Sequence, residues 1–285
     1  MGTQPREVNT GYGLPMTLHR IGGKDVSLQT VVDLTDTAPY RVFYEIEPYP
    51  NDTGLVQRVI DNHKFYNLIL TWRERILRAC PNAVKFLYAG PYLFATGNAL
   101  VIPAHVGIPS GPLESRYVSF LNPAKKFAVS FLTSSKDGLP GHKFRQEIFS
   151  RLPDSIGSCS LPIQKFRSYY PSIHIPEADR GRFFTDYQYH IAVENCQFNN
   201  WMTEKLFDCF MARTIPIYWG SPNVVEDFNT DGMFIVQNYD DLVTVLQNIG
   251  PDTYSSKAVA IEDNFNRVQF YNQPNRLGRI IEENL

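Results

Sequence analysis

Residues 187–223 read YQYHIAVENCQFNNWMTEKLFDCFMARTIPIYWGSPN, and this stretch decides the fold. Tyr189–Val193 and Ile215–Trp219 are short, mostly apolar runs, which is typical of buried strands. Between them, residues 199–203 read as a capped entry to a helix, and apolar residues follow at helical spacing. Gly220 ends the second run. A strand, a helix and a second strand at this spacing predict a βαβ unit with two parallel strands.

The same alternation extends over the rest of the chain. Expected strands cover residues 42–44, 66–72, 84–88 and 127–132, and expected helices cover 55–63, 73–80 and 141–152. Strands that alternate with helices favour parallel sheets with right-handed crossovers, so the predicted fold class is α/β. Residues 253–285 have the pattern of one or two helices.

The length of 285 residues fits two domains of about 100–200 residues each. Residues 103–123 are rich in proline and glycine and contain no long periodic segment, and we place the linker between the domains near Leu121-Asn122-Pro123. We therefore predict an N-terminal domain at 1–122, a C-terminal domain at 123–252, and a helical tail at 253–285 that packs back on the N-terminal domain.

The composition argues against several classes of protein. Hydrophobic residues make up 43 % of the chain and aromatic residues 13 %, which is enough for one or two cores. A net charge of −2 argues against a nucleic-acid or anionic-membrane partner. The first residues lack the apolar stretch of a signal peptide, and no run of about 20 apolar residues occurs. We therefore expect no membrane span and a cytoplasmic protein.

The four cysteines, Cys80, Cys159, Cys196 and Cys209, show no zinc-ligand spacing. We expect reduced thiols, at least two of them in core positions, as in a reducing compartment. A Rossmann oxidoreductase is also excluded, because no G-x-G-x-x-G follows an expected strand.

Thr203, Glu204 and Lys205 occupy the first turn of the helix in the βαβ unit. Ligands of open α/β sheets gather at the carboxyl ends of strands and at helix N-termini. A lysine has the wrong charge for this end of the helix dipole, unless an anion such as a diphosphate binds there as well. The alternative is that Lys205 is an ordinary solvated surface residue.

Two further groups of polar residues stand at similar positions. Glu194-Asn195 follows an expected strand, where a carboxylate can accept hydrogen bonds from sugar or ribose hydroxyls. The alternative is an acid that caps the next helix. Arg145, with His142 and Lys143, lies near the start of an expected helix and can complement phosphate. The alternative there is an amphipathic helix with a basic face.

Glu45 and Glu47 follow an expected strand at its carboxyl end and share one face, because they are two residues apart. A pair of carboxylates suggests acid–base chemistry, and the alternative is solvation of a strand edge that Pro48 ends. No D-x-D sequence occurs, so we expect no metal site for a nucleotide diphosphate. We place Asp240-Asp241 at the start of a helix.

One region of the chain closely resembles the donor-binding signature of the α1,3-fucosyltransferase family, particularly of its bacterial members. The resemblance spans more than 40 residues with the family's spacing. Its segments are Tyr187–Cys196, Thr203–Leu206, Thr214–Asn223 and Asp227–Asn229.

A weaker resemblance extends upstream. Arg145 looks like the family's phosphate-binding arginine. Residues 41–47 look like the strand that carries the family's proposed general base, which falls on Glu47, with Glu45 as the second choice.

The chain also departs from the family's pattern. Cys196 stands where a serine is usual, Val193 where an aromatic residue is often found, and Pro48 where bacterial relatives differ. The chain is short and is most similar to bacterial or viral members without a membrane anchor.

The resemblance implies two Rossmann-like domains that face each other across a cleft, the architecture called GT-B. It implies that the C-terminal domain binds a nucleotide-sugar donor and the N-terminal domain a glycan acceptor, without a metal or another cofactor. Transfer would be a single displacement with inversion: Glu47 takes the acceptor proton, while Arg145 and Lys205 stabilise the leaving diphosphate. The implied donor-binding residues are Arg145, Glu194, Asn195, Thr203, Glu204, Lys205, Tyr218, Gly220, Ser221 and Asn223.

GDP-fucose is the donor that the resemblance implies, in a bacterial or virus-infected cell. One alternative keeps the fold and the reaction but uses another donor, such as UDP-xylose. A second alternative is a non-catalytic protein that binds sugar nucleotides or glycans. The presence of Glu47, Glu194 and Lys205 argues against it, because a decayed enzyme is expected to lose such charged groups first.

Overall fold

The computed structural model describes residues 6–7, 16–21, 40–45, 54–87, 124–168, 177–272 and 276–284. The chain divides into two compact units. Unit 1 consists of Met1–Tyr88, Asn199–Trp201 and Asn275–Leu285, and unit 2 consists of Ala89–Phe198 and Met202–Pro274. The linker predicted near 121–123 lies outside the described residues, so the boundary between 122 and 123 stays a prediction.

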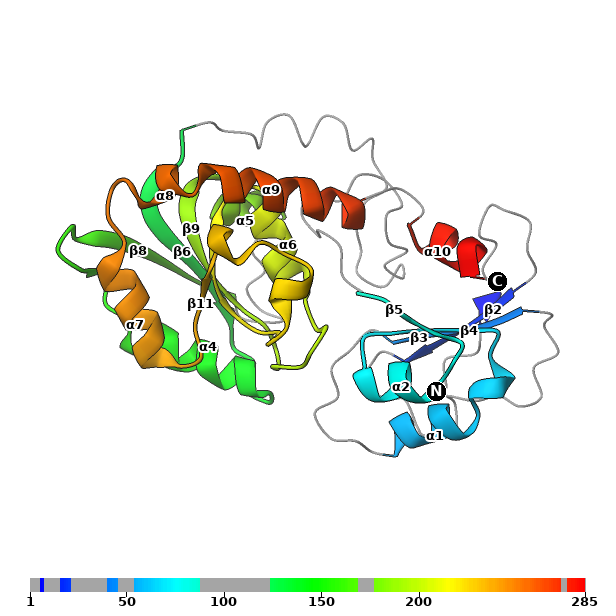
Figure 1. Cartoon of the computed structure of the whole chain (residues 1–285). Helices are drawn as coiled ribbons and strands as arrows, with labels where there is room; N and C mark the ends of the chain where they lie inside the picture. The colour runs from blue at the N-terminus through cyan, green and yellow to red at the C-terminus, as the bar shows by residue number, and fades with distance from the viewer. Residues whose placement is uncertain are drawn as a thin grey trace. The chain divides into compact units, whose positions relative to one another are not determined.

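Unit 1 is built on a five-stranded sheet in the order β1-β2-β3-β4-β5 (Figure 1). The strands are β1 (Arg6–Glu7), β2 (Met16–Ile21), β3 (Tyr40–Glu45), β4 (Leu68–Thr71) and β5 (Ala83–Lys85). The helices are α1 (Leu55–Asp61), the 3-10 helix η1 (His63–Phe65), α2 (Glu74–Ala79) and α10 (Arg276–Asn284). β1 and β2 are antiparallel, and the other neighbours are parallel. Phe43, Val59 and Ile69 are fully buried in a core that joins the sheet to α1 and α2.

Unit 2 is built on a six-stranded sheet in the order β11-β10-β9-β6-β8-β7. Its strands are β6 (Lys126–Ser134), β7 (Ser155–Ile156), β8 (Leu161–Ser168), β9 (Tyr187–Val193), β10 (Ile215–Trp219) and β11 (Phe234–Ile235). Its helices are α4 (Pro140–Arg151), α5 (Glu177–Thr185), α6 (Glu204–Met211), α7 (Tyr239–Asn248), α8 (Thr253–Ser256) and α9 (Ala258–Gln269). Short 3-10 helices cover η4 (Val224–Glu226), η5 (Thr230–Gly232) and η6 (Phe270–Asn272). All neighbouring strands are parallel except β7 and β8.

Different helices cover the two faces of the unit 2 sheet. Figure 1 shows α4 and α7 on one side of the sheet and α9 on the other. On the first side, Ile148 of α4 and Leu242 of α7 share a core with Val129 of β6 and Ile191 of β9. On the second side, α6 packs against β9, β10 and α9. β9 is buried along almost its whole length, as expected for a parallel strand that is covered on both faces.

The predicted α/β class is confirmed, and so is the βαβ unit, which consists of β9, α6 and β10. The other expected strands and helices are also present, with ends shifted by a few residues. The strand expected at 84–88 lies at Ala83–Lys85, and the tail contains α8, α9 and α10 where one or two helices were expected. Residues 253–274 belong to unit 2 and residues 275–285 to unit 1.

Strand β8 and helix α5 were not predicted from the sequence. Leu161 and Ile163 alternate into the core, as a strand requires. Pro162, Lys165 and Arg167 interrupt the apolar pattern, so the segment does not read as a strand. Its pairing with β6 stabilises it instead, which is a tertiary effect.

The sequence analysis also expected reduced cysteines, at least two of them in the core, and no membrane span. None of the four cysteines forms a disulfide, and Cys80, Cys196 and Cys209 are buried while Cys159 is exposed, which confirms the core positions. Across the described ranges, no helix has both the length and the apolar character that a bilayer span needs.

Candidate active site

The order of the strands in the unit 2 sheet reverses at β6. From β6 the chain first pairs β8 on one side and then returns to pair β9 on the other side. This reversal is a topological switch point, where the loops after neighbouring strands part and ligands commonly bind. Helix α4 follows β6 at this edge, and the loop from Glu194 to Thr203 follows β9. The predicted donor-binding residues lie on α4, on the loop after β9, in the first turn of α6, on β10 and on the loop after β10.

Helix α4 begins in direct contact with the loop after β9. The backbone N–H of Gly141 donates a hydrogen bond to the carbonyl oxygen of Asn195 at 2.9 Å. A Cβ atom at Gly141 would lie 1.7 Å from the carbonyl oxygen of Glu194, so a larger residue requires the backbone to move. Gly141 therefore sets the distance between the two segments. Sequence reasoning missed it, because a close approach leaves no mark in the apolar pattern.

Glu194 is fully buried at the end of β9, where Thr203 holds its carboxylate. The backbone N–H of Thr203 donates to Oε1 at 2.8 Å, and the hydroxyl of Thr203 donates to Oε2 at 2.6 Å. Burial raises the pKa of Glu194, although the Lys205 cation and the Thr203 hydrogen bonds oppose the shift. Thr203 is also the N-cap of α6. The carboxylate thus ties the end of the strand to the start of the helix, as in the capping alternative.

Lys205 is the second residue of α6, and its side chain is 28 % exposed. Its Nζ lies 2.7 Å from Oε1 of Glu204 and 3.9 Å from Oε2 of Glu194. Burial disfavours the cation, but the carboxylates of Glu204 and Glu194 outweigh this effect and raise the pKa of Lys205. A lysine at the positive end of the helix therefore has a local reason that the sequence did not show, namely the buried Glu194.

Arg145 lies on α4 and contacts the carboxyl end of β9. Its Nη1 donates to the carbonyl oxygens of Val193 and Glu194, and its Nη2 donates to Oδ1 of Asn195 at 2.9 Å. The residue is 7 % exposed. Burial lowers the pKa of Arg145, and the Glu194 carboxylate opposes the shift, but a guanidinium stays protonated in a protein. Arg145 thus brings a fixed positive charge to the switch point and orients Asn195.

His142 reports the electrostatics of this region. Its Nδ1 accepts a hydrogen bond from the backbone N–H of Leu139 at 3.2 Å. Burial, together with the cations of Arg145, Lys136 and Lys205, lowers the pKa of His142 to about 4. The imidazole is therefore neutral at physiological pH. Three cations therefore act on this ring, and the carboxylates of Glu194 and Glu204 lie beside one of them, Lys205.

The loop after β10 packs onto the same group of residues. Tyr218 is fully buried, and its hydroxyl accepts a hydrogen bond from the backbone N–H of Ser221 at 3.0 Å. The Ser221 hydroxyl donates to Oδ1 of Asn223 at 2.8 Å. A Cβ atom at Gly220 would lie 2.6 Å from Cγ of Glu194. Only a glycine allows this loop to approach the buried carboxylate so closely.

The structure brings all ten predicted donor-binding residues into one connected cluster. Within it, Glu194, Thr203 and Tyr218 are buried and bond to neighbouring parts of the protein. Lys205 and Glu204 keep 28 % and 38 % of their side chains exposed. The exposed charges are the ones that a ligand can reach, and the buried residues hold them in place. The donor-binding role of the cluster stays a prediction.

The second choice for the general base lies in unit 1. Glu45 ends β3 and is 1 % exposed. Its carboxylate lies 2.5 Å from Nε of Arg73 and accepts a hydrogen bond from the Thr71 hydroxyl at 3.2 Å. Burial raises the pKa of Glu45, and Arg73 opposes the shift. Arg73 in turn stacks on the ring of Trp72 at 4.3 Å. The first choice, Glu47, lies outside the described residues, so its role stays a prediction.

Metal ligands were not expected from the sequence. In the described part of the chain, no group of three or more His, Cys, Asp or Glu side chains is arranged to hold a metal ion. Asp240 and Asp241 lie in the first turn of α7, as predicted, and the side chain of Asn238 caps that helix.

Comparison with known proteins finds a family whose model matches the region of this cluster. Residues 140–256 match the model of glycosyltransferase family 10 (fucosyltransferase), C-terminal part. An α-(1,3)-fucosyltransferase of Helicobacter pylori is 28 % identical over 129 residues, which are 44 % of this chain and 25 % of the relative. An α-(1,3)-fucosyltransferase B of Drosophila melanogaster is 33 % identical over 160 residues, 50 % of this chain and 36 % of the relative. These matches confirm the resemblance, and the chain covers about a quarter to a third of these relatives.

Solved structures confirm the fold class. A crystal structure of an α1,3-fucosyltransferase with GDP-fucose aligns with a TM-score of 0.50 at 16 % identity, over 82 % of this chain and 75 % of that one. An α,α-trehalose-phosphate synthase from Burkholderia xenovorans aligns with a TM-score of 0.53 at 9 % identity, over 90 % of this chain and 70 % of that one. Both similarities concern the fold alone, which is that of GT-B glycosyltransferases.

Proposed function

We propose, because residues 140–256 match the fucosyltransferase domain, that this chain is an inverting glycosyltransferase. Its donor is GDP-fucose, and L-fucose passes to a hydroxyl group of a glycan acceptor in a single displacement. The relatives named above, which are α1,3-fucosyltransferases, support the choice of the sugar. The donor binds to unit 2 and the acceptor to unit 1. A cytoplasmic location stays a prediction.

One observation carries the proposal: fixed cations gather at the switch point of the matched domain. Lys205 is partly exposed at the N-terminus of α6, and Arg145 is anchored to the end of β9. A diphosphate that leaves the sugar gains negative charge as the bond breaks. Cations that are already in position stabilise this charge without reorganising, which is often the largest contribution to catalysis. They can replace a metal ion in this role, so we expect transfer without one.

The acceptor proton needs a base, and we assign this role to Glu47 rather than Glu45. The carboxylate of Glu45 is buried and already bonded to Arg73 and Thr71. A base must come within hydrogen-bond distance of the hydroxyl that it deprotonates. Glu45 would first have to break its ion pair. Glu47 is two residues further along, and the alternation of side chains expected from the sequence gives it the same face.

A thermal-shift experiment tests the donor. The purified chain is heated with GDP, UDP, GDP-fucose or UDP-xylose, each at a concentration well above its Kd. A ligand at 100 times its Kd adds about 2.7 kcal/mol of stability, which is easily measured as a higher Tm. We expect stabilisation by GDP and GDP-fucose. A shift with the uridine compounds alone would mean that the donor is a UDP-sugar.

A transfer assay in excess EDTA tests the reaction. Release of GDP from GDP-fucose is measured with a glycan acceptor present, and activity should survive chelation. Complete loss that Mn²⁺ restores would contradict the cationic mechanism. A chain that binds GDP but never transfers fucose would instead be a non-catalytic sugar-nucleotide-binding protein.

A further inference from the structure

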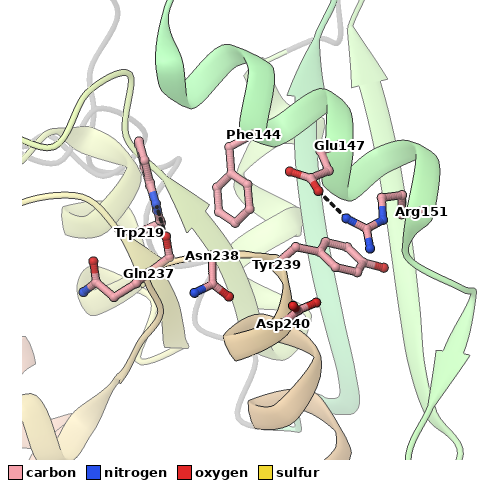
Figure 2. A pocket seen from close by; sticks show the side chains of 8 residues that line it. All are labelled: Phe144, Glu147, Arg151, Trp219, Gln237, Asn238, Tyr239 and Asp240. Carbon is pink, nitrogen blue, oxygen red and sulfur yellow. Dashed lines mark hydrogen bonds and ion pairs between the residues drawn. The ribbon is translucent and has the colours of Figure 1, made fainter.

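A cavity of about 350 Å³ opens in unit 2 between α4 and α7, beside the end of β10 (Figure 2). Three aromatic rings line it: Phe144 of α4, Trp219 of β10 and Tyr239 of α7. The carboxylates of Glu147 and Asp240 stand at its edges. Its volume lies at the lower end of the range of about 300–1,000 Å³ for small-molecule sites. The cavity therefore has room for a mono- or disaccharide.

Phe144 and Trp219, which are 9 % and 7 % exposed, form an apolar wall that belongs to the core. Their ring centroids are 5.4 Å apart at an interplanar angle of 45°. The indole Nε1 of Trp219 donates to the backbone carbonyl oxygen of Gln237 at 3.0 Å. Because an indole has no other polar atom, Trp219 offers only carbon atoms to a ligand. The next residue in the chain, Arg145, is not part of this wall. Its guanidinium donates a hydrogen bond to Asn195, which follows β9.

Tyr239 stands across from this wall and is fixed by a stacked cation. The guanidinium of Arg151 lies 3.9 Å from the centroid of the Tyr239 ring and also pairs with Glu147. Figure 2 shows Arg151, Glu147 and Tyr239 together on one side of the cavity. A ring that is held in place loses little entropy when a ligand stacks on it, so the cavity is prepared for a flat, partly apolar partner.

The charges and hydrogen-bonding groups at the rim of the cavity determine which ligands it can bind. Asp240 is exposed and can accept hydrogen bonds, while the amide groups of Gln237 and Asn238 can both donate and accept. The carboxylates of Glu147 and Asp240 outnumber the single guanidinium of Arg151, so the rim carries a net negative charge. Such a rim repels phosphate, sulfate and acidic sugars.

A pyranose ring has an apolar face of C–H groups and an edge of hydroxyl groups. The face matches the aromatic walls, and hydroxyls match carboxylates and amides. We infer that this cavity is a binding subsite for a neutral mono- or disaccharide unit of a glycan. The cationic cluster around Lys205 is not part of its lining. The inference goes beyond the proposed transfer reaction, because the subsite needs neither donor nor general base.

NMR titration of the full chain with lactose and with N,N′-diacetylchitobiose tests the subsite, in the absence of nucleotide. Sialyllactose serves as the anionic comparison and should bind more weakly. Asp240→Asn should weaken binding of the neutral disaccharides between about two- and tenfold, because it removes one charged acceptor. Tyr239→Ala should weaken it further. Asp252→Asn is the matched control, since Asp252 is an exposed acid at the N-terminus of α8.

Several results would overturn the inference. Neutral disaccharides could fail to bind the wild-type chain, or bind Asp240→Asn and Tyr239→Ala as tightly as the wild type. Circular dichroism shows whether Tyr239→Ala folds, and Asp240→Asn decides the question if it does not. GDP is titrated into the same variants. If Asp240→Asn loses GDP affinity as strongly as disaccharide affinity, the cavity is part of the donor site. Failure of GDP to bind the wild type would contradict the proposed function but not the subsite.

Discussion

Glu45 in unit 1 and Glu194 in unit 2 both stand at the carboxyl end of a buried parallel strand, and burial raises the pKa of both. Their partners differ. Glu45 lies 2.5 Å from the guanidinium of Arg73, in a direct ion pair. Glu194 accepts two hydrogen bonds from the uncharged Thr203, and the ammonium group of Lys205 is 3.9 Å away.

The difference shows how one residue type can serve two purposes. The ion pair of Glu45 satisfies both charges inside the protein, and the Arg73 side chain is only 13 % exposed. Thr203 anchors Glu194 by hydrogen bonds, and Lys205, which pairs with Glu204 at 2.7 Å, keeps 28 % of its side chain exposed. We conclude that the ion pair in unit 1 is closed, meaning that its two charges neutralise each other inside the protein and stabilise the fold. The arrangement in unit 2 holds a cation where a ligand can reach it.

The largest expected effect separates Glu47 from Glu45 as the base. Glu47→Gln keeps the size of the side chain but removes the base, so kcat should fall by about 10²–10⁴-fold while GDP affinity stays unchanged. Steady-state kinetics with GDP-fucose and a glycan acceptor measures this. If Glu47→Gln keeps more than about a tenth of kcat while a folded Glu45→Gln is inactive, the assignment is reversed.

The next effect tests whether the Glu45–Arg73 pair is closed. Glu45→Ala removes the buried carboxylate from this ion pair, which should cost about 3–5 kcal/mol of the free energy of unfolding. Urea denaturation measures it. Arg78 is 79 % exposed and pairs with Glu74, so Arg78→Ala is the control and should cost less than about 0.5 kcal/mol. Equal costs for the two variants would refute the comparison.

A smaller effect tests whether Lys205 is available to a ligand. Lys205→Ala removes a charge-assisted contact worth about 1.5–3 kcal/mol, so GDP affinity should fall by about 10- to 150-fold. Isothermal titration calorimetry measures the Kd. Lys64→Ala, at an exposed lysine of η1, should leave it unchanged. Arg145→Ala should weaken GDP binding and also lower the Tm, because Arg145 holds the end of β9. Unchanged affinity in both variants would place the phosphates elsewhere.

The last prediction concerns β9, the strand that precedes Glu194. His190 of β9 is buried, and burial lowers its pKa from the ordinary 6.5 to about 3. The unfolded chain therefore binds a proton first as the pH falls. The stability that this histidine contributes is complete above about pH 6.5 and is lost towards pH 3, at no more than about 1.4 kcal/mol per pH unit.

Hydrogen exchange of β9 amides at pH 7, 6 and 5 measures this loss, after correction for the intrinsic rates. His190→Asn removes the titration, so its stability should depend less on pH over the same range. The variant also changes the contact between His190 and the Ser130 hydroxyl, which are 2.8 Å apart, so its absolute stability is not the readout. An unchanged slope would mean that His190 titrates alike in the folded and unfolded chains.

Local patterns predicted most elements of the candidate site. β9, α6 and β10 were readable because their apolar residues follow one another at strand or helix spacing. A capped helix entry was predicted over residues 199–203, and the structure makes Thr203 the N-cap rather than a residue of the first turn. The tight contact at Gly141 and the cavity between α4 and α7 were not, since both depend on segments far apart in the chain.

The amino-acid sequence by itself determined the α/β class, the βαβ unit and the resemblance of residues 187–229 to the fucosyltransferase signature. Each of these depends on residues that are close together in the chain. Only the tertiary structure decided what each charge does. Glu45 is 28 residues from Arg73, and Arg145 is 50 residues from Asn195. Such partners meet because strands stack side by side in an order that no local pattern specifies. The free energy of a buried charge depends on all the neighbours that this order brings to it.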